Sequence, residues 1–129
     1  MRYLGIDYGS KRVGVALSDE AEKFAMPLSV ILNTPELIKE IEKLVADNEA
    51  KGIVIGESRK YDMTANKILP DILELKDELD KKGYITYLEL EFMTSQQAER
   101  EQGRHDKIDA SAAALILQSF LDRKGRENK

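Results

Sequence analysis

Residues 2–18, RYLGIDYGSKRVGVALS, contain the pattern that decides the fold. Residues 2–7 and 12–18 each alternate small or apolar residues with polar ones over the length of a strand. The YGSK segment between them supplies turn residues, so the stretch predicts a β-hairpin. Aspartate and glycine both weaken strands, so Asp7 beside Gly5 and Gly9 needs a functional explanation. We interpret Asp7 as a metal ligand placed near a phosphate.

The next segments predict further elements of an α/β sheet. Residues 27–32, PLSVIL, are typical of a third strand. Thr34 and Pro35 then indicate a helix start, with Thr34 as the cap and Pro35 at the first helical position. The run GIVIG at 52–56 is continuously apolar, which favours a strand buried on both faces at the centre of the sheet. The apolar face of the intervening helix has helical spacing and comprises Leu37, Ile38, Ile41, Leu44 and Val45.

The second half of the chain alternates helices and strands. Residues 56–67 are polar and indicate a flexible loop, and a strand is predicted over 84–92. A second helix has Ile68, Ile72, Leu75 and Leu79 on its apolar face. Pro70 within that helix either kinks it or marks its first turn. A short helix is expected at 94–101, and a last helix over 108–124.

The predicted order is therefore βββαβαβα, which indicates an α/β three-layer fold with a mixed five-stranded sheet. The length of 129 residues fits one domain spanning 1–129, with a polar tail expected to fray after about residue 122.

Composition limits the class of protein. Hydrophobic residues make up 42% and charged residues 34%, which is typical of a globular protein. The chain has no cysteine, which excludes disulfides and zinc–thiolate sites and favours an intracellular protein. No stretch has the roughly 20 apolar residues of a membrane span, so we expect a cytoplasmic protein. The net charge of −4 excludes a surface that is basic all over.

Three carboxylates fall where this order of elements can bring side chains together. Asp7 ends the first strand, Glu91 lies near the end of the last strand, and Asp109 lies at the start of the last helix. Mg²⁺ and Mn²⁺ prefer oxygen ligands, and phosphodiester cleavage with two metal ions needs several carboxylates. Taken singly, Glu91 also fits a surface residue at a strand end, and Asp109 fits an acid in the first turn of a helix.

Three blocks of the chain resemble the YqgF (RuvX) family, and in the order found in that family. These blocks are GIDYGSKRVGVALSD at 5–19, MTSQQAE at 93–99 and IDASAAALILQSFL at 108–121. The resemblance covers almost the whole chain and implies a ribonuclease H-like fold. It also implies a nuclease, either a Holliday junction resolvase or an enzyme that matures the precursor of small-subunit (16S) ribosomal RNA. The metal ligands would then be Asp7, Glu91 and Asp109.

Two segments depart from the usual pattern of the family. Where the family has Asp-Glu-Arg, this chain has Leu90-Glu91-Phe92, which keeps only the glutamate. Where the family has a proline after the central strand, this chain has Gly56-Glu57-Ser58. Glu57 is either an additional ligand or a solvated loop acid.

Basic clusters supply candidate substrate contacts. Lys11 and Arg12 lie in the turn next to Asp7 and are predicted to hold the nucleic-acid backbone. Arg59 with Lys60, and Arg104 with Lys107, are further candidates, with a solvated surface as the alternative interpretation. His105, the only histidine, is a candidate for proton transfer from a loop.

Two other functions remain open from the sequence. The first is a nucleotide-binding module, because residues 7–17 also resemble the phosphate hairpin of actin-like kinases and chaperone ATPases. Those proteins close a cleft between two lobes, and this chain has the length of one. The second is a catalytically silent nucleic-acid binder, given the altered residues around Glu91. A homodimer is a further possibility, because a junction resolvase needs two sites related by symmetry.

Overall fold

The computed structural model describes residues 2–59, 69–92 and 105–127, with side chains described over 2–56, 70–89 and 112–125. Its elements follow the order β1 (Arg2–Asp7), β2 (Arg12–Ser18), β3 (Ala25–Leu32), α1 (Leu37–Asn48), β4 (Ala50–Arg59), α2 (Leu69–Lys81), β5 (Thr86–Phe92) and α4 (His105–Glu127). The predicted order βββαβαβα is therefore confirmed, and the hairpin strands begin and end at the predicted residues.

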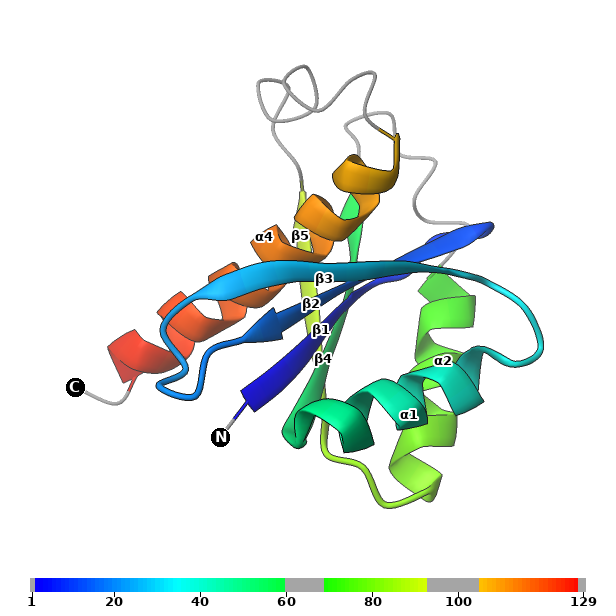
Figure 1. Ribbon diagram of the computed structural model, residues 1–129, viewed down its shortest axis with the longest axis horizontal. Coiled ribbons are helices and arrows are strands. Elements are labelled where there is room, and N and C mark those ends of the chain that lie inside the picture. The colour runs from blue at the N-terminus through cyan, green and yellow to red at the C-terminus, as the bar shows by residue number, and fades with distance from the viewer. Residues whose placement is uncertain (1, 60–68, 93–104, 128–129) are drawn as a thin grey trace.

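The five strands form one mixed sheet in the order β3-β2-β1-β4-β5. The β1–β2 and β2–β3 pairs are antiparallel, whereas β1–β4 and β4–β5 are parallel. Because β1, β4 and β5 are parallel, their carboxyl ends lie at the same edge of the sheet. Figure 1 shows α1 and α2 on one side of this sheet and α4 crossing the other side.

Alternation along β1 divides the core into two layers. Leu4 and Ile6 belong to the cluster under α1 and α2, whereas Tyr3 belongs to the cluster under α4. Gly5 lies on the α4 side, where an added Cβ would be 2.8 Å from Leu117 Cβ. The absence of a side chain at Gly5 therefore lets α4 lie close against β1.

Several predicted boundaries were wrong. α1 begins at Leu37 rather than at Pro35, because Thr34 closes a turn in which its hydroxyl accepts from Glu36 N and its carbonyl accepts from Leu37 N. β4 continues to Arg59, through residues predicted as a loop, because β5 pairs with it as far as Phe92. Pro70 is the second residue of α2, which places it in the first turn. Residues 94–101, predicted as a short helix, lie outside the described residues.

The last helix is longer than predicted at both ends. α4 begins at His105, so Asp109 lies in its second turn rather than at its start. The helix also continues to Glu127, although the polar composition indicated fraying after about residue 122. Its final turns are held by Lys124, whose Nζ donates to Glu22 at 3.2 Å and lies 5.8 Å from the centre of the Tyr3 ring. Contacts distant in sequence thus hold Lys124, which lies in the polar segment after residue 122.

Glu22 accepts hydrogen bonds from two lysines, because Lys51 Nζ also donates to it, at 3.1 Å. Burial raises the pKa of Glu22, but the hydrogen bonds from Lys51 and Lys124 outweigh burial and hold the pKa below its ordinary value of 4.5. A carboxylate with a lowered folded-state pKa stabilises the fold above its unfolded-state pKa, and the stabilisation is lost as the pH falls through the folded-state pKa.

We expect Glu22→Gln to lower the melting temperature at neutral pH and to have little effect in acid. Thermal unfolding of both proteins between neutral pH and about pH 3 measures this difference. The matched control is Glu20→Gln, which alters an exposed pair with Arg2 at 3.9 Å in the same loop. A difference between Glu22→Gln and wild type that stayed constant over this pH range would contradict the assigned role of the charge.

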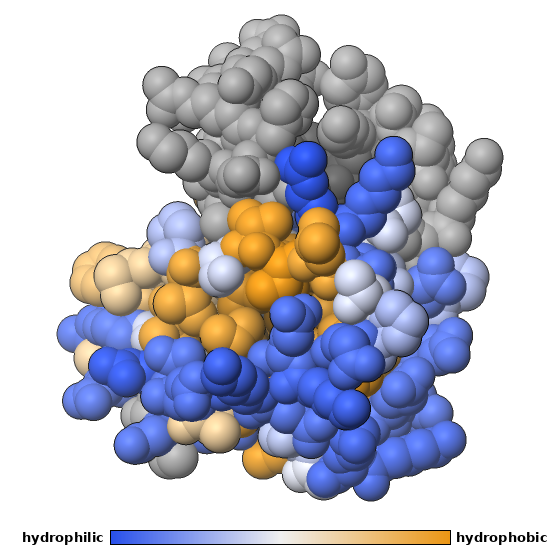
Figure 2. Space-filling view, turned by 45° about the vertical axis from the view of Figure 1, so that its right-hand side comes forward, coloured by the Kyte–Doolittle hydropathy of each residue, from blue (hydrophilic) through white to orange (hydrophobic). Residues whose placement is uncertain are grey.

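β3 forms one edge of the sheet and carries a concentration of exposed apolar residues. Among the large apolar side chains that are exposed, Phe24, Met26, Leu28 and Leu32 lie on β3 or immediately before it. Figure 2 shows apolar side chains gathered in one area of the surface, next to a largely polar region. Within the described residues, no helix is long and apolar enough to cross a membrane.

Candidate functional site

Asp7 lies at the carboxyl end of β1 and is 7% exposed. In the sheet it is flanked by Gly14 of β2 and Gly56 of β4, so neither neighbouring strand places a side chain next to its carboxylate. Carboxylate oxygens are the ligands that Mg²⁺ and Mn²⁺ prefer. A carboxylate at this strand end therefore fits the predicted role of a metal ligand.

The position of Asp109 follows from the way α4 crosses β1. Phe120 contacts Tyr3 with ring centres 5.3 Å apart, and Leu117 and Ala113 lie against Gly5. Moving along β1 by two residues therefore corresponds to moving back along α4 by about one turn, since the two steps are roughly 6.6 and 5.4 Å. The next such step leads from Gly5 to Asp7 on the strand, and from Leu117 to Ala113 on the helix. Asp109 therefore lies about one turn further toward the amino end of α4, beyond the carboxyl end of β1.

Glu91 lies at the same edge of the sheet, two strands away from Asp7. Gly56 pairs with both Asp7 and Glu89, so Glu91 lies two residues beyond the row that contains Asp7. The three predicted ligands thus come from the carboxyl ends of β1 and β5 and from the second turn of α4. The side chains of Glu91 and Asp109 lie outside those that the structure describes. Among the residues whose side chains are described, no three acids or histidines are grouped closely enough to hold a metal ion.

The turn after Asp7 is held in place by Asn33. Its Nδ2 donates to the Gly9 carbonyl at 2.8 Å, and its backbone N donates to the Lys11 carbonyl at 2.9 Å. An added Cβ on Gly9 would be 2.4 Å from the Arg12 carbonyl, so this turn requires glycine. The sequence analysis missed Asn33, because its role depends on contacts with residues more than twenty positions away.

The other predicted substrate residues are only partly placed. Lys11 and Arg12 are exposed next to Asp7, and Arg12 is the first residue of β2. Arg59 ends β4 at the same edge of the sheet, and Lys107 lies in the first turn of α4. Glu57 lies within β4 and not in a loop, and His105 is the first residue of α4 rather than part of a loop. Lys60 and Arg104 lie outside the described residues.

The face of β5 toward α4 contains a second buried carboxylate, which the sequence analysis missed. Glu89 is 2% exposed, and its Oε2 accepts from Ser119 Oγ at 3.1 Å. Its Oε1 lies 2.5 Å from Arg123 Nη2, an ion pair that lacks the angles of a hydrogen bond. Alternation of Tyr87, Glu89 and Glu91 on one face of the strand was the available signal. Both partners of Glu89 lie toward the carboxyl end of α4, far along the helix from Asp109, so we assign Glu89 a structural role.

Comparison with known proteins identifies the family. The family model described as "RuvX: Holliday junction resolvase" matches residues 1–123. The chain belongs to the RuvX family.

Curated relatives of this RuvX protein match it over nearly their full length. One from Lactobacillus delbrueckii subsp. bulgaricus, named "Putative pre-16S rRNA nuclease", is 34% identical and covers 98% of this chain and 100% of its own. A relative with the same name from Nitratidesulfovibrio vulgaris is 33% identical over 95% of this chain and 94% of its own.

Solved structures confirm the fold of this RuvX protein. T. thermophilus RuvC in complex with a Holliday junction substrate aligns with a TM-score of 0.51 at 16% identity, covering 97% of this chain and 96% of that chain. The Fowlpox virus resolvase in complex with Holliday junction DNA aligns with a TM-score of 0.53 at 8% identity. The alignment covers 95% of this chain and 98% of that chain. The predicted ribonuclease H-like fold is therefore confirmed.

Proposed function

We propose that this RuvX protein is a metal-dependent endonuclease that hydrolyses phosphodiester bonds in the precursor of 16S ribosomal RNA, in the cytoplasm. The observation that carries the proposal is the buried Asp7, flanked by glycines at the edge of the sheet where β5 also ends at Glu91 and Phe92. The names of full-length relatives support this choice of substrate.

In this proposal Asp7, Glu91 and Asp109 hold Mg²⁺ or Mn²⁺. When bound, such an ion would supply Lewis-acid stabilisation of the phosphate and would lower the pKa of a water molecule as nucleophile. Asp7 contributes a carboxylate held by the sheet, so its position costs little rearrangement when the substrate binds. Phe92 stands where the family has arginine. Cations outside the segment Leu90-Glu91-Phe92 must therefore make the contacts with the phosphate.

Lys11 and Arg12 lie in and just after the turn that follows Asp7, and we assign them to the substrate backbone. Asn33 fixes the backbone of their turn, so both side chains start from a backbone that is held in place near the Asp7 carboxylate. Contacts to phosphates position a nucleic acid without reading its sequence. Selection of the cleavage site therefore depends on the shape of the folded RNA.

A second candidate substrate is a four-way DNA junction, which the description of the matching family model favours. Resolving a junction requires two symmetric cuts, so this alternative also requires a homodimer. A nuclease that matures RNA requires no such symmetry.

The test is a side-by-side cleavage assay with a precursor 16S fragment and a four-way DNA junction, in Mg²⁺ or Mn²⁺ and with chelator. We expect cleavage of the RNA that chelator abolishes, because the carboxylates alone supply no nucleophile. Cleavage of the junction alone would replace our substrate with branched DNA. Binding of either substrate without cleavage would indicate a silent nucleic-acid binder, as the residues around Glu91 allow.

A further inference from the structure

A cleft of about 220 Å³ lies between α2 and the start of α1, on the face of the sheet opposite α4. Its floor is apolar and is formed by Leu37, Ile38 and Leu75. Tyr8, the residue after Asp7, also lines it, and packs with the core under α1 and α2. Because Tyr8 and Asp7 alternate along the chain, the cleft and the candidate active site lie on opposite faces of the sheet.

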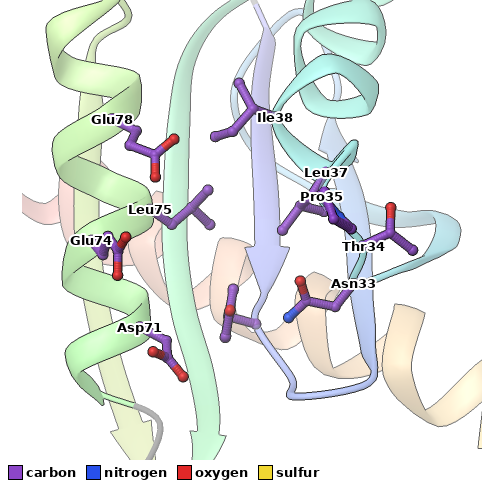
Figure 3. Close-up of a pocket in the computed structure, with 10 residues that line it drawn as sticks. Asn33, Thr34, Pro35, Leu37, Ile38, Asp71, Glu74, Leu75 and Glu78 are labelled. Carbon is purple, nitrogen blue, oxygen red and sulfur yellow. The ribbon is translucent and has the colours of Figure 1, made fainter.

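Three carboxylates form one wall of this cleft. Asp71, Glu74 and Glu78 are spaced by three and four residues along α2, which places them on one side of the helix. Figure 3 shows these acids on the side of α2 that faces α1. No lysine, arginine or histidine is among the residues that line the cleft.

The remaining acids near the end of α2 are compensated within the helix. Asp77 pairs with Lys81 at 3.0 Å, and Asp80 pairs with Lys76 at 3.0 Å. None of the three acids of the cleft forms an ion pair with any described residue, although Lys81 lies near enough to Glu78 for its pKa to be raised slightly by that charge, after the larger effect of Asp77. Like charges at this spacing destabilise a helix, so the wall of the cleft carries a repulsion that a bound cation would relieve.

The size and charge of the cleft limit what it can hold. The three acids are not grouped closely enough for a shared metal ion, since no such group exists among the described side chains. A nucleic-acid phosphate is excluded by repulsion from the carboxylates. The occupant must therefore be cationic, larger than a metal ion, and apolar along part of its length.

We propose that the cleft binds the side chain of an arginine or lysine from a basic polypeptide segment of another protein. Such side chains combine an apolar stem with a charged end, which matches an apolar floor beside a carboxylate wall. The Tyr8 ring adds a surface on which a guanidinium stacks favourably. The three carboxylates of this cleft lie outside the candidate active site, although Asn33, which lines the cleft, also holds the turn after Asp7.

The test is the binding of a fluorescently labelled peptide with several arginines to the full chain. The anisotropy of the peptide's fluorescence measures the binding. The variant is Glu74→Gln/Glu78→Gln, and the matched control is Glu40→Gln/Asp47→Asn, which changes the net charge equally at exposed positions of α1. We expect the variant to weaken binding about tenfold and the control to change it less than about twofold. A peptide with citrulline in place of arginine should not bind.

Thermal unfolding at low salt supplies a second readout. We expect Glu74→Gln/Glu78→Gln to raise the melting temperature by about 1–3 °C, because it removes repulsion within α2. A lowered melting temperature would overturn the proposal, since it would mean that a cation of this chain already fills the cleft. Equal weakening of peptide binding by variant and control, absence of binding to the wild type, or equally tight binding of spermidine would also overturn it.

Discussion

An Asp7→Asn variant is expected to cleave the preferred substrate at least about 1,000-fold more slowly than the wild type. Asparagine has the shape of aspartate but lacks the charge that holds a divalent cation. Asp7 is buried at the end of β1 between two glycines, so no neighbouring strand residue can replace its carboxylate. The loss should therefore appear in the rate of cleavage and not in the folding of the sheet.

Single-turnover cleavage with saturating enzyme measures this effect without the influence of product release. The matched control is Asp47→Asn, an equivalent charge change at an exposed position of α1, and it should cleave like the wild type. Substrate binding by Asp7→Asn should be nearly unchanged. If Asp7→Asn retained more than about a tenth of the wild-type rate while folding normally, Asp7 would not be a metal ligand for the reaction.

The hairpin was predictable because its signals are local. Residues 2–18 carry both the alternation of the strands and the glycine required by the turn, and the strands begin and end where predicted. The boundaries that were wrong depend on distant partners. Glu57, Ser58 and Arg59 have the composition of a loop, and they become strand because β5 pairs with them. No local pattern at 57–59 contains that information.

For the candidate site, the sequence predicted which strand or helix carries each of the three carboxylates, but not how they lie relative to one another. Asp7, Glu91 and Asp109 were selected for residue type and resemblance, and they remain a prediction as a group. The sequence analysis could not show that Gly14 and Gly56 flank Asp7, because strand register is set by pairing across the sheet. For the same reason it did not single out Glu89, which lies on the same face of β5 as Glu91 and is buried.

The Arg123→Ala variant is expected to lower the free energy of unfolding by about 3 kcal/mol, or about 10 °C in melting temperature. It would leave the Glu89 carboxylate, which is 2% exposed in the wild type, with only the Ser119 hydroxyl as a described partner. An uncompensated buried charge is far more costly than the loss of an exposed ion pair. The expected effect lies at the lower end of the range for buried pairs, because the Arg123 side chain is 49% exposed.

Urea unfolding of Arg123→Ala, with Arg2→Ala as control, separates this cost from the general loss of an arginine. Arg2 forms a pair with Glu20 at 3.9 Å that is largely exposed, so its removal should cost less than about 1 kcal/mol. The double variant Glu89→Leu/Arg123→Met should recover most of the stability lost in Arg123→Ala, because it removes the buried charge together with its partner. If the double variant were as unstable as Arg123→Ala, the contact of the Arg123 guanidinium with the Phe120 ring would explain the loss instead. Recovery would show that Arg123 stabilises the protein by compensating the buried charge of Glu89, where α4 packs on β5.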